Sequence, residues 1–208
     1  MHNYTIEGDI RNKITMYITL LSVGIYIILS LILSFFGIKL LPLNITTANP
    51  AFRFIFKLFE IGFIFGPLKY FFDNYLWKTK LMKKIHKIPD FNHIWDGSFE
   101  SSKVDEYGNN YTGSCKMEIK QTWTKIHIIS HFNQSTSYSD DATIKTNCTT
   151  GIELKFTYEN KAEKTANKNM KAHGGTNILI YNEADNELVG NYYTDKNRET
   201  NGFISVSR

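Results

Sequence analysis

The sequence is poor in cysteine, with only 2 among its 208 residues, Cys115 and Cys148. One possible pair cannot build the disulfide framework of a small secreted domain, and neither cysteine stands in a paired metal-ligand spacing. Histidine does not replace cysteine as a metal ligand. His127 and His131 would share a face only on a helix, whereas the surrounding segment KIHIISHF has the composition of a strand. We therefore expect packing roles for the cysteines and no metal site.

Catalytic signatures are also absent from the sequence. It contains no glycine-rich phosphate loop, no nucleophile elbow and no other spaced set of nucleophile, base and orienting residue. We predict a protein that is not an enzyme and that uses no cofactor. A closed barrel can still assemble a catalytic set from distant strands, so an enzyme remains an alternative.

Charge is missing from residues 14–38, ITMYITLLSVGIYIILSLILSFFGI. A helix needs about 20 apolar residues to cross the hydrocarbon core of a bilayer, so this run predicts a membrane span. A cleaved signal peptide is the alternative. Its apolar core is typically only about 7–15 residues long and is followed by a small-residue cleavage site, which fits this run poorly.

A second apolar stretch, residues 51–77, is rich in phenylalanine but includes the charged residues Arg53, Lys57, Glu60 and Lys69. Lys57 and Glu60 lie three residues apart, so they can partly neutralise each other on one helical face and take part in assembly. A helix lying along the membrane surface is the alternative. A second crossing is favoured because it returns the chain to the side of residues 78–88, which hold five lysines. We predict a two-span hairpin with both termini in the cytoplasm.

The charge of the remaining chain argues against binding of duplex DNA or RNA. The whole chain has a net charge of +4, but residues 88–208 hold 13 basic and 16 acidic side chains, a net charge of −3. Duplex binding needs a broad basic footprint, whereas the lysines near the apolar stretches suit a lipid bilayer. We divide the chain into an N-terminal cytoplasmic tail (1–13), a transmembrane hairpin (14–77), a basic juxtamembrane linker (78–88) and a soluble sensor domain (89–208).

The soluble domain has the pattern of about eight short strands separated by turns, with the segment 133–142, NQSTSYSDDA, as a polar loop. Eight antiparallel strands can close into a barrel with room for one small ligand. The predicted fold is therefore mainly β, a small closed antiparallel eight-stranded β-barrel preceded by a two-helix transmembrane hairpin. An open sandwich is the alternative. The lysine-rich segment 160–173 is either a lid over the barrel mouth or a solvated loop.

Alternation along residues 188–202, LVGNYYTDKNRETNG, places an aromatic ring, a hydroxyl and a nearby guanidinium on one side of a strand. Tyrosine stacks on bases and arginine binds phosphate through two parallel hydrogen bonds, so this combination suits a flat, anionic ligand. We predict a ligand site formed by Tyr158, Asn160, His173, Thr176, Tyr192, Thr194, Arg198 and Thr200. Alternatively, the tyrosines only fill the barrel and His173 only caps a turn.

Short motifs behind the two apolar stretches carry a family resemblance. They are Trp95/Gly97/Phe99, Tyr158/Glu159/Asn160, His173/Gly174/Gly175/Thr176, Leu188/Gly190/Tyr192/Tyr193/Thr194 and Arg198/Thr200/Gly202. In this order, they resemble the two-span, β-strand-rich effectors of bacterial cyclic-oligonucleotide (CBASS) antiphage signalling.

The resemblance implies a receptor and effector in one chain. Its barrel would bind a cyclic di- or oligonucleotide made by a partner synthase, and the chain would then form a homo-oligomer. The oligomer would disrupt the bacterial inner membrane, leading to cell death. Because a W-x-G motif also opens lipocalin barrels, a membrane-tethered carrier of a small apolar ligand is the alternative.

Overall fold

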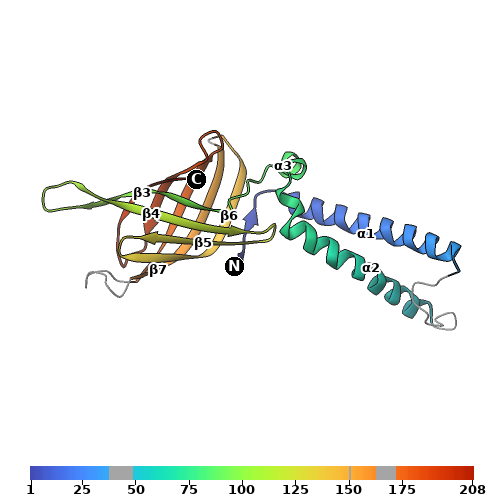
Figure 1. The fold of residues 1–208 in the computed structure, drawn as a ribbon. Helices are drawn as coiled ribbons and strands as arrows, with labels where there is room; N and C mark the ends of the chain where they lie inside the picture. The colour runs from blue at the N-terminus through green and yellow to red at the C-terminus, as the bar shows by residue number, and fades with distance from the viewer. Residues whose placement is uncertain (38–48, 150, 163–171) are drawn as a thin grey trace. The chain divides into compact units, whose positions relative to one another are not determined.

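The computed structural model describes residues 1–37, 49–149, 151–162 and 172–208. The chain separates into two compact units, drawn in Figure 1. Gly8–Thr79 form a helical unit, while Met1–Glu7 and Lys80–Arg208 together form a unit built on a sheet. Most of the predicted lid, residues 163–171, lies outside the described residues, so the lid stays a prediction.

The helical unit contains α1 (Ile10–Phe35), α2 (Pro50–Asn74) and the short 3₁₀ helix η2 (Leu76–Lys78). Among the described residues, α1 is the one helix that is both long and apolar enough to cross a membrane. At about 1.5 Å per residue its 26 residues reach about 39 Å, more than the hydrocarbon core requires. The helix α2 does not pass the same test, so the second crossing rests on the sequence argument alone.

Glu60, a charged residue in the middle of α2, finds its partner on the other helix. Its Oε2 atom accepts a hydrogen bond of 2.6 Å from the hydroxyl of Tyr26 on α1. In the described part of the chain Lys57 forms no ion pair with Glu60, which differs from the neutralisation considered from their spacing. A polar side chain within a span is commonly satisfied in this way by a neighbouring helix.

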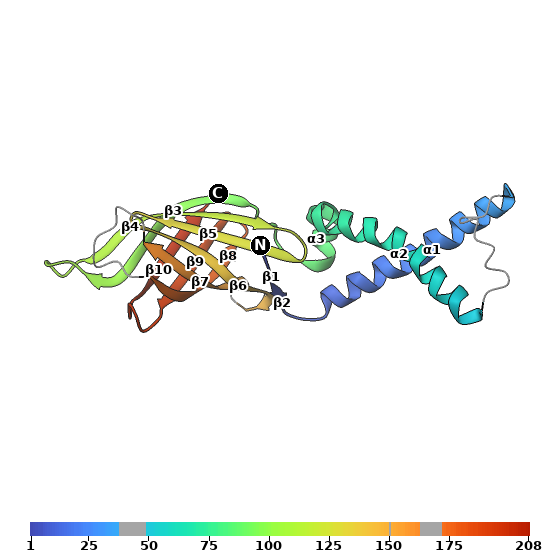
Figure 2. The same ribbon diagram turned by 90° about the horizontal axis from the view of Figure 1, so that it is seen from below.

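The other unit, a sheet with one short helix, provides the predicted barrel. Its elements are β1 (His2–Asn3), β2 (Thr5–Ile6), α3 (Lys80–His86), β3 (His93–Val104), β4 (Asn110–Gln121), β5 (Lys125–Phe132), β6 (Ser135–Cys148), β7 (Gly151–Ala162), β8 (His173–Asn182), β9 (Glu187–Thr194) and β10 (Asn201–Ser207). The strand order is β1-β5-β4-β3-β10-β9-β8-β7-β6-β2, and an additional pairing of β5 with β6 closes the ring. Strands β3 to β10 therefore form a closed, antiparallel, eight-stranded barrel, which confirms that part of the predicted fold (Figures 1 and 2).

The seam of the barrel lies between β5 and β6. These strands pair over four residues only, from Ile129 with Tyr138 to Phe132 with Ser135. Beyond this stretch β1 pairs with β5, and β2 runs parallel to β6 at Thr143 and Ile144. The segment predicted as an N-terminal tail therefore adds two short strands to the sheet. They pair with β5 and β6 where these two strands no longer pair with each other.

The interior of the barrel changes character along its axis. At the end where β3 begins, the inward side chains are large, apolar and at most 1% exposed, as in Trp95, Ile128, Leu154 and Leu188. At the other end, buried polar side chains join the aromatic ones on the inward face: Ser135, Ser137, Asn160, His173 and Asn177.

This polar end explains a wrong prediction. The sequence predicts a polar loop over residues 133–142, but β6 begins at Ser135 and continues through this segment. The serines at 135, 137 and 139 are all buried, so the strand shows the expected alternation with hydroxyls on its inward face. A strand that turns hydroxyls inward lacks the apolar alternation by which strands are recognised in a sequence.

Candidate ligand-binding site

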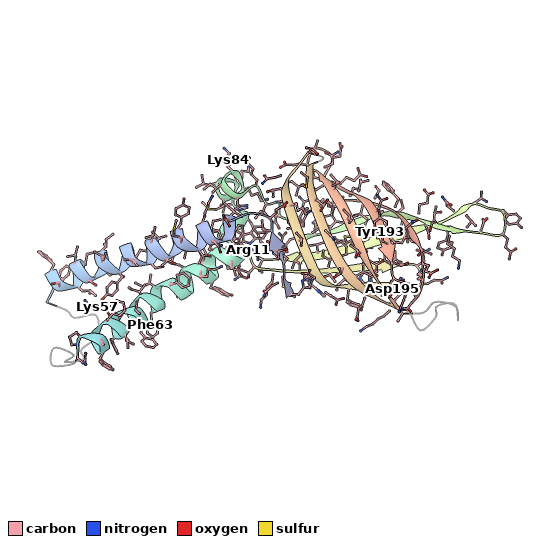
Figure 3. All side chains as sticks on the ribbon, turned by 180° about the vertical axis from the view of Figure 1, so that it is seen from behind. Arg11, Lys57, Phe63, Lys84, Tyr193 and Asp195 are labelled. Carbon is pink, nitrogen blue, oxygen red and sulfur yellow. The ribbon has the colours of Figure 1, made fainter. Side chains whose placement is uncertain are left out.

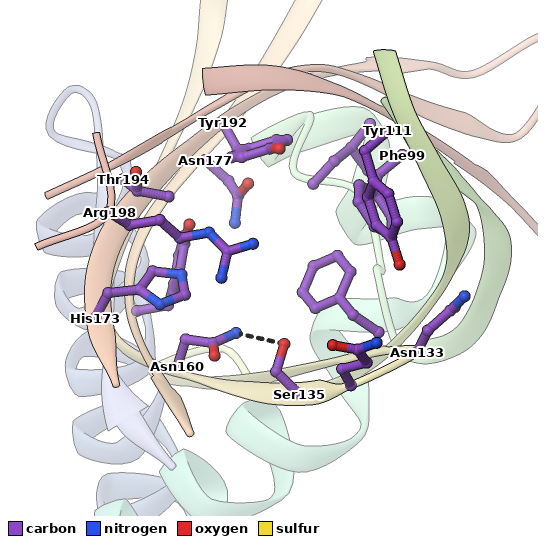
Figure 4. A pocket seen from close by; sticks show the side chains of 14 residues that line it. Phe99, Tyr111, Asn133, Ser135, Asn160, His173, Asn177, Tyr192, Thr194 and Arg198 are labelled. Carbon is purple, nitrogen blue, oxygen red and sulfur yellow. Dashed lines mark hydrogen bonds between the residues drawn. The ribbon is translucent and has the colours of Figure 1, made fainter. Parts of the chain in front are cut away.

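A pocket opens at the polar end of the barrel (Figure 4). About 530 Å³ of space lies between its lining atoms, with the open solvent at its mouth included. One side is aromatic, where the ring of Phe99 packs edge-on against Phe132 at 5.2 Å and lies 6.1 Å from Tyr111. The opposite side is polar and is formed by Tyr158, Asn160, His173, Asn177, Tyr192, Thr194 and Arg198.

Three aromatic rings of the pocket each lie across a glycine of the neighbouring strand. A methyl group on any of these glycines would lie no more than 2.7 Å from a carbon of the ring, closer than van der Waals contact allows. The missing side chain therefore gives each ring the space to lie against the barrel wall, which leaves the lumen open. The cross-strand pairs are Phe99 with Gly113, Tyr158 with Gly175 and Tyr192 with Gly202.

The loop between β9 and β10 carries Arg198 and is fixed by Asp195. The Asp195 carboxylate accepts hydrogen bonds of 2.9 Å from the backbone N–H of Gly174 on β8 and from that of Asn197. Its carbonyl oxygen accepts another from the N–H of Arg198 at 3.1 Å. The bond from Gly174 is the main reason that the pKa of Asp195 lies below its ordinary value. The ionised carboxylate thus ties the loop to β8, and Figure 4 shows the Arg198 guanidinium directed into the pocket.

Two buried asparagines present carbonyl oxygens that lack a partner. The amide nitrogen of Asn160 donates to the hydroxyls of Ser135 and Ser137, at 3.1 and 2.8 Å. Within the described ranges, no donor lies within hydrogen-bond distance of Oδ1 of Asn160 or of Oδ1 of Asn177. Their residues are only 4% and 2% exposed. Buried polar atoms are rarely left unpaired in native proteins, so these two oxygens, enclosed in the wall of the pocket, are exceptions.

The electrostatics of the pocket favour an anion. None of the described lining residues is an aspartate, glutamate or lysine, and Arg198 contributes a permanent positive charge. Burial raises the pKa of Tyr158 and that of Tyr192, against the opposing effect of the Arg198 charge. Both phenols therefore stay neutral and remain hydrogen-bond donors near the cation.

Comparison with known proteins identifies the barrel. A family model described as Cap15, cyclic dinucleotide receptor domain, matches residues 86–208, more than half of the chain. The chain belongs to this Cap15 family. It is 29% identical over 213 residues to CD-NTase-associated protein 15 of Yersinia aleksiciae, covering all of this chain and 97% of that protein. It is also 29% identical over 137 residues to CD-NTase-associated protein 15 of Staphylococcus schleiferi, covering 66% of this chain and 70% of that one. The resemblance to the CBASS effectors is thereby confirmed.

Six of the eight site residues predicted from the sequence line the same pocket of this Cap15 barrel. They are Tyr158, Asn160, His173, Tyr192, Thr194 and Arg198. Their contact with a ligand remains a prediction.

The other two predicted residues do not line the pocket. Thr176 follows the inward Gly175 on β8, so alternation turns its side chain to the other face of the sheet. Thr200 shapes the loop instead, because its carbonyl accepts a 2.8 Å hydrogen bond from the Thr194 hydroxyl, and its N–H donates back to that hydroxyl at 2.8 Å.

Sequence reasoning missed several lining residues of the Cap15 pocket. Asn177 was within reach, because it lies four residues after His173 on the same strand and alternation places both on one face. No local signal indicated the others, since their proximity depends on which strands the barrel brings together. They are Phe99, Tyr111, Phe132, Asn133, Gln134, Ser135 and Ile204.

Proposed function

We propose that the pocket of this Cap15 barrel binds a cyclic dinucleotide and that binding activates the helical unit as an antiphage membrane effector. The observation that supports it most is the composition of the pocket: aromatic rings, one guanidinium and amide side chains, with no carboxylate among the described lining residues. A cyclic dinucleotide offers a matching set, with two flat bases, N–H donors and two phosphates.

Each part of the pocket has a proposed role toward this ligand. Arg198 binds a phosphate, while rings such as Tyr192 and Phe99 provide stacking surfaces for bases. Stacking contributes about 1–3 kcal/mol per base, and a hydrogen bond to a charged group about 1.5–3 kcal/mol. Micromolar affinity corresponds to about 8 kcal/mol, so no single contact is sufficient and both sides of the pocket must take part.

The seam of the barrel offers a route from the ligand to the membrane helix. Asn160 holds Ser135 and Ser137 of β6, and the next inward serine, Ser139, accepts a hydrogen bond from the N–H of Ile128 on β5. The Ser139 hydroxyl also bonds Nε2 of His2 at 2.7 Å. Because β2 ends at Ile6 and α1 begins at Ile10, a shift of β6 acts on the chain only a few residues before the predicted span.

The proposed output is assembly of the helical units in the bacterial inner membrane. In this proposal α1 and α2 both cross the bilayer, with both termini in the cytoplasm, and the ligand shifts the protein toward a homo-oligomer that disrupts the membrane. The long rows of exposed apolar side chains on α1 and α2 support burial in lipid. The alternative function, a carrier of an apolar ligand, predicts a cavity lined mainly by leucine, isoleucine and phenylalanine. Most residues that line this pocket are of other types.

Binding and leakage can be tested separately. Thermal shift of the full chain in detergent, with cyclic dinucleotides and fatty acids as ligands, reports binding. We expect stabilisation by a cyclic dinucleotide, and at least a tenfold loss of affinity in Arg198→Ala but not in Lys196→Ala, an exposed lysine on the same loop. Stabilisation by fatty acids alone would support the carrier instead.

The effector step is tested in dye-filled liposomes that contain the full chain. Leakage should require the cyclic dinucleotide and should be lost in Arg198→Ala combined with Tyr192→Ala. Leakage that ignores the ligand, or that persists in the double variant, would refute the coupling of the pocket to the membrane.

A further inference from the structure

The helix α3 has two different faces, and one of them packs on the barrel. This inner face carries Met82 and His86, which lie four residues apart. His86 is 4% exposed, and its ring centroid lies 4.9 Å from that of Trp123, between β4 and β5. Its Nδ1 atom accepts a hydrogen bond of 3.0 Å from the N–H of the buried residue Ile88. The helix is therefore part of the sheet unit and has a fixed orientation on the barrel.

The opposite face of α3 is apolar and exposed. Leu81 and Ile85, also four residues apart, are 67% and 52% exposed. Lys84, which is labelled in Figure 3, lies beside them on the exposed side of the helix. Lys80 and Lys87 flank this face and are exposed as well. An apolar pair bordered by lysines is typical of an amphipathic helix that lies in the headgroup region of a bilayer.

Charge and chain position favour lipid over protein as the partner of this face. Residues 78–87 hold five lysines and no aspartate or glutamate, so anionic lipid attracts this segment and the same segment of a second copy repels it. The helix α2 ends at Asn74, six residues before α3 begins. Six residues span at most about 20 Å, so a crossing by α2 holds α3 near the bilayer surface.

We infer that α3 docks the sheet unit on a surface of anionic lipid. The side chains of Leu81 and Ile85 enter the apolar layer, while the flanking lysines extend toward the lipid phosphates. The inference rests on the proposed membrane location of the helical unit and does not depend on nucleotide binding. It adds a surface through which the sensor itself contacts the membrane.

Docking through α3 determines the direction in which the pocket faces. Trp123, which contacts α3, comes just before β5, and the pocket residue Asn133 follows directly after this strand. The eight residues of β5 span about 26 Å. The pocket mouth therefore opens at the end of the barrel away from the lipid, where a soluble ligand can enter.

The test uses a fluorescent probe at three positions of the full chain in liposomes. Single cysteines are introduced as Leu81→Cys, Ile85→Cys or Tyr107→Cys in a Cys148→Ser background, in which the remaining Cys115 is buried. Tyr107 is 88% exposed in the turn between β3 and β4, so it serves as the control position. Each cysteine carries an environment-sensitive fluorophore. Nitroxide-labelled lipids, in phosphatidylcholine vesicles with or without phosphatidylglycerol, quench a probe that enters the bilayer.

With phosphatidylglycerol, quenching at the two α3 positions should exceed quenching at the control position by about threefold or more. Lys80→Gln combined with Lys84→Gln should reduce this difference, because fewer lysines then face the anionic lipid. Lys103→Gln combined with Lys116→Gln is the matched control, since both lysines are exposed on strands, and it should leave the difference unchanged.

Equal quenching at all three positions, or quenching at α3 that does not increase with phosphatidylglycerol, would overturn the inference. A probe on α3 with blue-shifted emission but no quenching would also overturn it, because protein rather than lipid would then cover this face. If the chain does not float with the vesicles at all, the proposed membrane location itself fails, and this outcome differs from the others.

Discussion

The unpaired carbonyl of Asn177 leads to an unusual prediction: removing this buried polar side chain should raise the free energy of unfolding. Replacing Asn177 by leucine should stabilise the ligand-free protein. The side chain is 2% exposed and its Oδ1 atom has no donor in the described part of the chain. An unsatisfied buried polar atom typically costs about 1–3 kcal/mol of folding free energy, and leucine has a similar size without that cost.

The expected gain follows from these values. If a part of the penalty is recovered, the free energy of unfolding rises by about 1–2 kcal/mol. For a unit of this size, 1 kcal/mol corresponds to roughly 3–5 °C in melting temperature, so the expected shift is about +3 to +10 °C. Asn160→Leu provides the matched contrast, because it removes two hydrogen bonds to serines and should lower the melting temperature.

The assay is thermal unfolding of the full chain in detergent without nucleotide, followed by tryptophan fluorescence, since Trp95 and Trp123 are both buried in the sheet unit. The same Asn177→Leu protein should bind the cyclic dinucleotide more weakly than wild type. A fall in melting temperature for Asn177→Leu comparable to that of Asn160→Leu would refute the reasoning, because it would mean that the Asn177 carbonyl is satisfied in the free protein. Stability lost for the sake of binding is common at functional sites.

Three further predictions concern other parts of the sheet unit. Gly175→Ala should push the ring of Tyr158 into the pocket, because a methyl group at this position would overlap the ring. We expect the affinity for a cyclic dinucleotide, measured by calorimetry, to fall at least tenfold. An unchanged affinity would contradict this prediction. Deletion of residues 2–6 should lower the melting temperature by several degrees, because it exposes the edges of β5 and β6 at the seam; an unchanged melting curve would show that these strands add nothing. Burial raises the pKa of Cys115 to about 12, so at pH 8 a thiol reagent should modify Cys148 in the native chain and Cys115 only after unfolding; two fast thiols would contradict the buried position.

The barrel was predictable from the sequence because most of its strands follow ordinary alternation. In the segment 151–160, for example, apolar residues occupy every second position from Ile152 to Tyr158. Eight such strands also suggested closure, which the pairing of β5 with β6 confirms. Because local patterns encode this part of the fold, its strands could be predicted without knowledge of tertiary contacts.

The strands that escaped prediction are those whose formation depends on tertiary context. The N-terminal segment 2–6 is too short to show any period, and it forms strands only because β5 and β6 leave free edges beside it. The first half of β6 has serines on its inward face, which is favourable only where the barrel interior is a binding site. Asn177, in contrast, shares its inward face with His173, so alternation along β8 could have identified it.

The order of the two units along the chain differs from a simple anchor followed by a receptor. The family match begins at residue 86, but in this chain Met1–Glu7 belong to the same compact unit as the barrel. The chain therefore starts in the sensor, leaves it at Gly8 for the helices, and returns at Lys80. Tyr4, at the centre of the first segment, is 1% exposed and accepts a hydrogen bond of 3.3 Å from the Gln121 side chain. The helical unit is thus inserted between two segments of the sheet unit and is connected to it at both ends, and the strand connection before α1 lies outside the residues that match the receptor domain.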